Sequence, residues 1–295
     1  MIGHLQTIAA VLFPPPPIVF ERCRWETPDG DFIDVDFAGE PHAPRLMVLL
    51  HGLEGCSDSH YARRLARALP ASGWRIAIPH WRGCSGEPNR KPRAYHSGDS
   101  AELDWILRRF AGPVDAIGIS LGGNVLLKWL GEQGAAATPL VRRAAAISAP
   151  LDLAAAGRAL DRGLNRLLYT RMFLSTLKPK SLAQLERFPR LFDHTRLRRA
   201  RSFREFDDTY TAPLHGFRDV DHYWTSSSSG PWLERIHVPT LVINARNDPF
   251  LPEPALEAAA AGAASCVLLE FPRTGGHVGF RGEWLAQRLI EFFRT

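Results

Sequence analysis

The regular alternation of short apolar runs with helical segments is the feature that most constrains how this chain can fold. Continuous apolar runs of this length are typical of strands buried on both faces of a sheet. Strands are predicted at Arg45–Leu50, Trp74–Pro79, Val114–Ile119, Arg143–Ser148, Thr240–Ala245 and Cys266–Phe271. Helical spacing falls between and after them, at Tyr61–Leu69, Ser100–Phe110, Asn124–Leu130 and Glu283–Phe293. The pattern predicts an α/β fold with a mostly parallel central sheet flanked by helices.

Two local patterns add detail to this fold. Val19–Phe37 contains two strand-like runs around the turn Thr27–Gly30, which predicts an antiparallel N-terminal hairpin. Asp99 precedes the helix that begins at Ser100, and Glu102 follows three residues later. This spacing is typical of a capping box, so Asp99 is expected to cap that helix.

The alternation stops between Leu151 and about Gly230, where the sequence shows helical patches but no strand signal. We interpret this stretch as a helical cap insertion above the carboxyl edge of the sheet. The expected domain organisation is therefore an α/β core of residues 1–150 and 231–295 and a helical cap insertion of residues 151–230.

Composition argues against several classes of protein. Hydrophobic residues make up 45% and charged residues 23% of the chain, which is ordinary for a globular protein with a sizeable core. The four cysteines form no CxxC pair, which argues against a zinc site and fits thiols kept reduced in a cytosol. No basic leader precedes the apolar run Ile8–Phe13, and no stretch approaches the roughly 18 apolar residues of a membrane-spanning helix. We expect a cytoplasmic protein without a transmembrane segment.

The net charge of +5 comes from arginines spread through the chain, which is the usual sign of a solvated surface. No nucleic-acid-binding motif accompanies this charge, so no nucleic-acid partner is expected. The sequence has no GxGxxG, P-loop or HExxH motif, and no cofactor or metal is expected. One basic run is either a solvated helix face or a contact for lipid headgroup phosphates at a membrane surface. It consists of Arg196, Arg198, Arg199, Arg201 and Arg204.

The motif Gly118-Ile119-Ser120-Leu121-Gly122 directly follows a predicted strand and precedes a predicted helix. This context is typical of a serine that stands on a sharp strand-to-helix turn as a nucleophile. A side chain two residues before or after the serine would collide with neighbouring backbone. Glycine has no side chain, so Gly118 and Gly122 avoid these collisions. We predict that Ser120 is a nucleophile; the alternative is a chance match in a glycine-containing loop.

A nucleophilic serine needs a histidine as base and an acid that orients the histidine. His277 lies within Gly275–Gly279, between the last predicted strand and the last helix, and is the predicted base. Asp248 follows the strand Thr240–Ala245 and is the predicted acid, because the chain order in such folds is Ser, acid, His. Asp152 competes with it, since it also follows a strand; its alternative role is a helix cap.

The oxyanion of a tetrahedral intermediate needs N–H donors. One is expected from the backbone of Leu121, the residue after the nucleophile. The other is expected from the loop His51–Gly55, where Leu53 is the preferred donor. His51 itself is expected to brace this loop and not to act as the base.

Beyond these positions the sequence resembles the YheT-like α/β-hydrolases, also called the AB-hydrolase-4 group. The similarity extends over effectively the whole chain, and its most specific segment is Phe206–Pro213. The matching segments are His4–Ile8, Thr27–Phe32, His51–Gly55, Gly118–Asn124, Phe206–Pro213, Asn247–Phe250 and Gly275–Phe280. The resemblance implies an α/β-hydrolase fold and a charge-relay triad of Ser120, Asp248 and His277 that cleaves carboxylic esters. Some relatives act on acylglycerols or phospholipids, and some eukaryotic relatives carry a membrane anchor that is not expected here.

The expected function is a serine esterase that forms an acyl-enzyme intermediate and acts on a small-molecule or lipid ester. A thioesterase or phospholipase using the same triad, or a non-catalytic binding protein on the same fold, are the alternatives. Apolar side chains of the insertion are expected either to shape an acyl pocket or to fill the core of the insertion. They are Leu167, Leu168, Tyr169, Met172, Phe173, Leu174, Phe217, Tyr223 and Trp224.

Overall fold

The computed structural model describes residues 1–295 and contains one eight-stranded sheet in the order β1-β2-β4-β3-β5-β6-β7-β8. The pairs β1/β2 and β2/β4 are antiparallel, and every other pair is parallel. The strands are β1 Glu21–Glu26, β2 Phe32–Ala38, β3 Arg45–Leu50, β4 Trp74–Pro79, β5 Val114–Ile119, β6 Val141–Ile147, β7 Thr240–Ile243 and β8 Val267–Glu270. The predicted mostly parallel sheet and its antiparallel N-terminal hairpin are confirmed.

Thirteen α-helices and five further helical turns accompany the sheet. The α-helices are α1 Ile2–Leu12, α2 His60–Ala68, α3 Ser100–Leu107, α4 Leu121–Gln133, α5 Leu153–Leu160, α6 Gly163–Asn165, α7 Arg171–Arg187, α8 His194–Arg199, α9 Phe203–Phe206, α10 Ala212–Leu214, α11 Val220–Ser227, α12 Glu253–Ala260 and α13 Trp284–Arg294. The turns are η1 Pro70–Ser72, η2 Gly134–Ala137, η3 Arg166–Thr170, η4 Asp207–Thr211 and η5 Gly230–Arg235.

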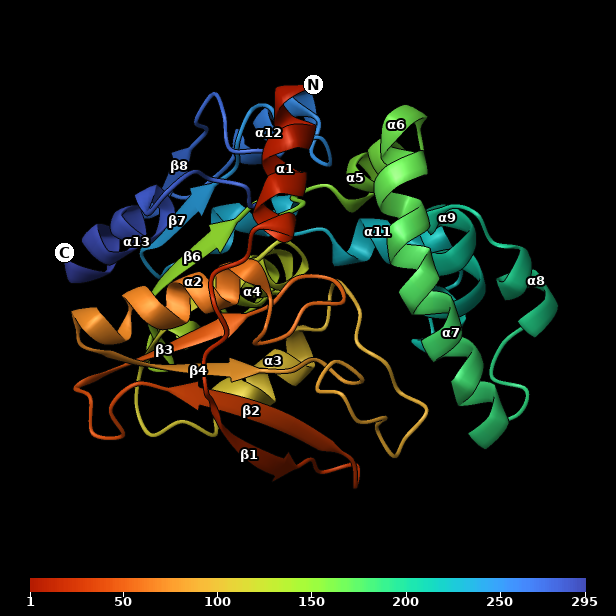
Figure 1. Ribbon diagram of the computed structural model, residues 1–295, viewed down its shortest axis with the longest axis horizontal. Helices are drawn as coiled ribbons and strands as arrows, with labels where there is room; N and C mark the ends of the chain where they lie inside the picture. The colour runs from red at the N-terminus through yellow and green to blue at the C-terminus, as the bar shows by residue number, and fades with distance from the viewer.

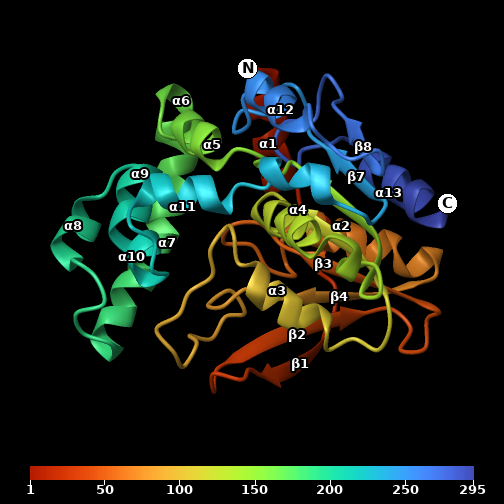
Figure 2. The ribbon, with the colours of Figure 1, turned by 180° about the vertical axis from the view of Figure 1, so that it is seen from behind.

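Helices cover both faces of the sheet because its strands are apolar on both faces. Along β3, Met47 and Leu49 point to one face, and Val48 and Leu50 point to the other. Helices α2 and α13 pack on the first face and lie in front of the sheet in Figure 1. Helices α3, α4 and α12 pack on the second face, and α3 and α4 are in front in Figure 2.

Between β6 and β7 the chain forms only helices and helical turns. Helices α5 to α11 of this stretch lie to one side of the sheet in both views. They bury a core of their own, which includes Leu174, Leu197, Phe203 and Trp224. The absence of strands here agrees with the sequence pattern, whereas the division of the chain into a core and a cap stays a prediction.

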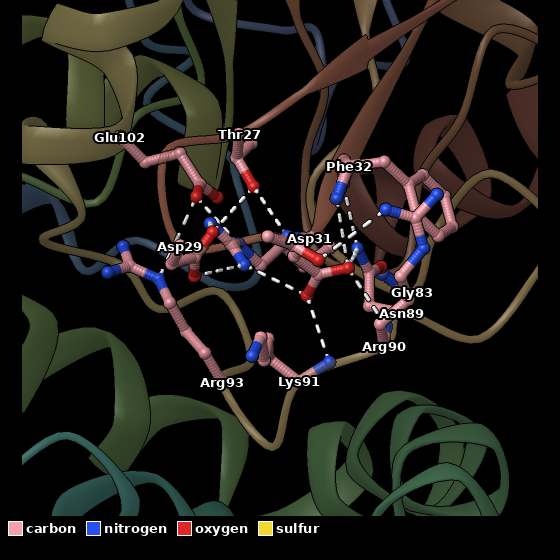
Figure 3. Close-up of polar contacts among 12 residues, drawn as sticks. Thr27, Asp29, Asp31, Phe32, Gly83, Asn89, Arg90, Lys91, Arg93 and Glu102 are labelled. Carbon is pink, nitrogen blue, oxygen red and sulfur yellow. Dashed lines mark hydrogen bonds and ion pairs between the residues drawn. The ribbon is translucent and has the colours of Figure 1, made fainter.

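A buried ion network joins the β1–β2 hairpin, the loop after β4 and helix α3. The Arg82 guanidinium lies 2.9 Å from carboxylate oxygens of Asp29 and Asp31 and 2.7 Å from Glu102. Figure 3 shows these three carboxylates converging in one cluster. Asp31 also accepts the backbone N–H of Arg90 at 2.8 Å. The network therefore fixes the long loop between β4 and α3.

The same network explains why the predicted capping box is wrong. The Asp99 side chain forms no cap hydrogen bond to α3 and instead lies 2.6 Å from the Arg93 guanidinium. Glu102 turns inward to Arg82 and so cannot reach back to the N–H of Asp99. A guanidinium group carries a full positive charge, whereas a backbone N–H does not, so both carboxylates pair with arginines in preference to the helix N-terminus.

Candidate active site

Ser120 occupies the sharp turn between β5 and α4, with φ of 52° and ψ of −117°. This backbone conformation is strained for a residue other than glycine. A Cβ added at Gly122 would lie 2.4 Å from the carbonyl oxygen of Leu50, and one at Gly118 would lie 2.5 Å from the Gly122 oxygen. Such short distances are sterically impossible, so the two glycines of the motif allow the turn to form.

Ser120, His277 and Asp248 form one hydrogen-bonded row. His277 Nε2 lies 2.9 Å from Ser120 Oγ, and its Nδ1 lies 2.8 Å from Asp248 Oδ2. The Asp248 side chain is buried, and its Oδ1 accepts the backbone N–H of Phe250 at 2.8 Å. This arrangement can move a proton from the serine hydroxyl to the imidazole while the carboxylate holds Nδ1–H.

Asp152 lies outside this row. Its Oδ1 accepts the backbone N–H of Ala155 at 2.9 Å, and Asp152 is thus the N-cap of α5. The structure brings Asp248, and not Asp152, into contact with His277.

The two residues expected to bind the oxyanion have backbone N–H groups without an acceptor in the chain. Leu53 and Leu121 line one pocket together with Ser120 and His277. Leu121 is the first residue of α4, where N–H groups have no acceptor within the helix. The Leu53 N–H donates no hydrogen bond within the chain. Both donors are therefore free to bind an oxygen atom of a ligand.

His51 is a neutral brace beneath this loop. Its Nε2 accepts the backbone N–H of Trp81 at 3.1 Å, so the proton is on Nδ1, which lies 2.8 Å from the Gly52 oxygen. Complete burial lowers the pKa of His51 to about 3. The imidazole is thus uncharged and fully occupied in hydrogen bonds.

Helix α1 holds the loops that carry Asp248 and His277. The Thr7 Oγ accepts the backbone N–H of His277 at 2.8 Å. The Gln6 side-chain oxygen accepts the Asn247 amide at 2.8 Å and the Gly275 N–H at 3.2 Å. A helix from the start of the chain therefore ties together two loops from its end.

The ring of Phe250 stacks on the His277 imidazole, with 4.1 Å between centroids and 29° between planes. Phe250, Gln6 and Thr7 belong to no catalytic motif and were not predicted as individual site residues. All three belong to segments that carry the family resemblance, His4–Ile8 and Asn247–Phe250, and this was the available signal.

Comparison with known proteins now assigns the family. The family model described as the alpha/beta hydrolase fold matches residues 45–281. YheT of Escherichia coli (strain K12), which is named as a candidate esterase, is 38% identical over 92% of this chain and 84% of its own. The chain belongs to the YheT-like α/β-hydrolases.

One further relative and one solved structure are also similar to this chain. The human phospholipase ABHD3 is 29% identical to this chain, and the aligned region covers 92% of this chain and 69% of ABHD3. The structure of an esterase from Pyrococcus furiosus, 15% identical, matches with a TM-score of 0.61 over 95% of this chain and 97% of its own. At that identity the structural match supports the fold alone.

In this YheT-like hydrolase, a cavity of about 170 Å³ opens beside Ser120 and His277. Fifteen of its 29 lining residues are hydrophobic, which is typical of a site for an apolar ligand group. The leucine and aromatic residues among them are Leu53, Tyr95, Leu121, Leu153, Leu160, Leu177, Phe203, Phe206, Tyr210, Tyr223, Trp224, Phe250 and Leu251.

The expectation that the apolar side chains of the insertion either shape an acyl pocket or fill the core of the insertion is partly wrong. Tyr223 and Trp224 line the cavity, but Leu167, Leu168 and Met172 do not, and all three are exposed to solvent. The physical reason is that η3 and the first turn of α7 present these side chains on the outer face.

Polar side chains complete the wall of the cavity. The Asp207 carboxylate accepts hydrogen bonds from Trp224 Nε1 at 2.8 Å and Thr211 Oγ at 2.7 Å. Burial raises the pKa of Asp207 to about 6. On another side, Lys180 of α7 pairs with Glu54 of the loop after β3 at 2.9 Å.

Three observations concern ions and surfaces. No group of three or more His, Cys, Asp or Glu side chains is arranged to hold a metal ion. None of the helices combines the length and the apolar composition needed to cross a bilayer. In the basic run of α8 and α9, Arg196 pairs with Asp208 and Arg204 with Asp221, so part of its charge is neutralised.

Proposed function

We propose that this YheT-like hydrolase cleaves carboxylic esters through an acyl-enzyme intermediate. The observation that carries the proposal is the hydrogen-bonded row of Ser120, His277 and Asp248 beside an apolar cavity. A protein retaining the fold only for binding would have no need of a strained serine in contact with a histidine. This favours catalysis over the non-catalytic alternative.

In the first half-reaction Ser120 Oγ attacks the ester carbonyl carbon while His277 Nε2 takes the hydroxyl proton. The Leu53 and Leu121 N–H groups stabilise the oxyanion. His277 then returns the proton to the departing alcohol oxygen. In the second half-reaction a water molecule attacks the acyl-enzyme, and the same groups release the carboxylic acid. Asp248 holds Nδ1–H and stabilises the imidazolium throughout.

Residues 151–230 would act as a cap that selects the acyl group, because most of the large apolar cavity residues come from this stretch. An apolar cavity of roughly 150 Å³ holds a molecule of the size of benzene. A cavity of about 170 Å³ therefore supports a short acyl chain. The free thiols of all four cysteines support a reducing compartment such as the cytoplasm.

The test is fluorophosphonate labelling combined with hydrolysis of p-nitrophenyl esters of increasing acyl length. Wild type should be labelled and should prefer short esters. Ser120→Ala should abolish labelling and lower kcat on the order of 10⁶-fold, because the nucleophile is lost. Ser226→Ala, at an exposed serine of α11, is the matched control and should behave as wild type. Labelling that survives Ser120→Ala would refute the proposal.

A phospholipid ester is the second candidate, and the name of the human relative is the observation that favours it. Release of fatty acid from phosphatidylcholine vesicles, faster than hydrolysis of soluble short esters at equal ester concentration, would favour this candidate. A thioesterase would instead prefer acyl-CoA thioesters over the matching oxygen esters.

A further inference from the structure

The exposed apolar side chains of this protein are concentrated on two segments. Thirteen large hydrophobic residues are exposed, and ten of them belong to the stretches 1–13 and 164–172. They are Met1, Ile2, Leu5, Val11, Leu12, Phe13, Leu164, Leu167, Leu168 and Met172. Exposed hydrophobic residues scattered singly need no explanation, but a concentration of this kind marks an interaction surface.

Helix α1 has the reverse of the usual amphipathic arrangement. Its polar residues Gln6 and Thr7 are buried against the active-site loops. Its apolar residues Leu5 and Leu12 are 67% and 65% exposed on the opposite side. A surface helix ordinarily buries its apolar stripe, so the outward apolar face of α1 is available to a partner.

The second segment combines apolar and basic side chains. Leu167 of η3 is 66% exposed and Met172 of α7 is 49% exposed. Arg162, Arg166 and Arg171 alternate with them and are also exposed. None of these three arginines forms an ion pair, which distinguishes them from Arg196 and Arg204 of the more obvious basic run.

The two segments belong to one surface. His4 of α1 stacks on Tyr169 of η3, with 5.7 Å between ring centroids, and its Nδ1 lies 3.1 Å from the Tyr169 hydroxyl. Helices α1 and α6 lie at the same end of the molecule in Figures 1 and 2. Tyr169 packs edge-on against Phe250, which stacks on His277. The surface is therefore separated from the His277 imidazole by only two aromatic rings.

We propose that this surface, formed by residues 1–13 and 162–172, docks on an anionic lipid membrane. Apolar side chains that enter the headgroup region, next to arginines that contact lipid phosphates, are the combination by which a protein binds such an interface without spanning it. Residues 1–20 contain no acidic side chain that would oppose this contact. Docking does not depend on the proposed ester hydrolysis, since neither Ser120 nor His277 takes part in it.

Charge complementarity favours a lipid surface over a second copy of this chain. In a symmetric dimer each patch meets its own copy, which would bring unpaired Arg162, Arg166 and Arg171 close to the same arginines of the partner. Lipid phosphates instead supply the opposite charge that these guanidinium groups lack within the protein.

The test is co-sedimentation of the Ser120→Ala protein with vesicles, so that lipid turnover plays no part. The vesicles are pure phosphatidylcholine or an equimolar mixture with phosphatidylglycerol. The protein should sediment with the mixed vesicles and much less with phosphatidylcholine, and added salt should weaken binding. The double substitution Leu5→Ser, Leu167→Ser should weaken binding by about tenfold or more, because two apolar side chains leave the interface.

Matched controls separate this surface from the rest of the protein. Arg166→Gln with Arg171→Gln should weaken binding by roughly tenfold, whereas Arg198→Gln with Arg199→Gln, at exposed arginines of α8, should not change it. Leu268→Ser on β8 is the control for the leucines. With Ser120 intact, the Leu5/Leu167 variant should hydrolyse a soluble short ester as fast as wild type.

The proposal is overturned if the protein stays in the supernatant with both kinds of vesicle, or if the Leu5/Leu167 and Arg166/Arg171 variants bind as wild type does. Concentration-dependent dimerisation that these variants abolish, without vesicle binding, would assign the surface to a second copy. Loss of ester hydrolysis at Ser120 has no bearing on these outcomes, so the two proposals fail independently.

Discussion

His277 is held from four directions, and each contact can be removed separately. Asp248 and Ser120 bond its two ring nitrogens, Phe250 covers one face of the ring, and Thr7 accepts its backbone N–H. In the proposed mechanism the imidazole must keep its tautomer and its position while it passes a proton in both half-reactions. Catalysis should therefore respond to changes at each contact in a different way.

Asp248→Asn should lower kcat by roughly 10⁴-fold, because the amide no longer fixes the tautomer in which Nε2 accepts the serine proton. Asp152→Asn should leave kcat and stability nearly unchanged, since asparagine caps a helix about as well as aspartate. Steady-state hydrolysis of a p-nitrophenyl ester measures both. A larger loss at Asp152 than at Asp248 would reverse the assignment of the acid.

Thr7→Val should lower kcat by about tenfold with little change in KM, because the valine leaves the His277 N–H without an acceptor and loosens the loop. Thr7→Ser restores the hydroxyl and should recover most of the activity. Measuring kcat and KM for both variants separates a positioning effect from general destabilisation. Equal losses in the valine and serine variants would show that the hydrogen bond is not the cause.

Some of these residues could be predicted from the sequence and others could not. The contacts of Ser120 and Asp248 with His277 could be predicted, because the motif and the order of strands restrict the positions of these residues. Thr7 and Gln6 could not be predicted, because their contacts with His277 and Asn247 span 270 and 241 positions along the chain. No local periodicity encodes a contact of that separation.

At the scale of elements, the helical turn η4 places a carboxylate inside an apolar wall. Burial raises the pKa of Asp207 from 3.8 to about 6, and Trp224 of α11 and Thr211 both donate hydrogen bonds to it. Because the folded state holds the proton more tightly than the unfolded state, the contribution of Asp207 to stability is full below about pH 3.8. It is lost as the pH rises through about 6.

Asp207→Asn removes the titrating carboxyl group. The amide oxygen of the variant can still accept the Trp224 Nε1–H, and its amide nitrogen can donate to Thr211 Oγ. Relative to wild type, the free energy of unfolding of the variant should rise between about pH 4 and pH 6 and remain constant above that range. Urea denaturation of both proteins across this range measures the difference. A difference that does not change with pH would mean that the carboxyl titrates normally.

The elements differ in how well their sequences predict them. The strands β3, β4 and β5 end where the apolar runs end, since a strand buried on both faces must be apolar throughout. Helix α1 escaped prediction because its apolar face points outward and its inner face carries Gln6 and Thr7. Helix α12 was not predicted because only Leu256 and Ala260 of its eight residues are buried. Two buried residues are too few to produce a helical period of apolar positions.

At the scale of the whole molecule, the Arg82 network connects parts of the fold that the sheet alone does not. Arg82 is buried, and it faces three carboxylates from the β1–β2 turn and helix α3. Breaking a buried ion pair from one side leaves uncompensated charge in the interior, which costs far more than the loss of an exposed pair.

Arg82→Met should therefore lower the free energy of unfolding by about 3–5 kcal/mol, as measured by urea denaturation. Arg108→Met, which breaks an exposed pair with Asp104 on α3, should lower it by no more than about 1 kcal/mol. Equal effects of the two substitutions would mean that the network around Arg82 contributes no more than a surface pair.

Helix α1 also has a consequence for how the protein is made. During synthesis α1 leaves the ribosome long before its partners Asn247 and His277, which follow it by 241 and 270 positions. A nascent chain can thus fold much of its sheet and still lack a working site. Hydrolytic activity should therefore appear only after His277 has emerged and reached Thr7 of α1.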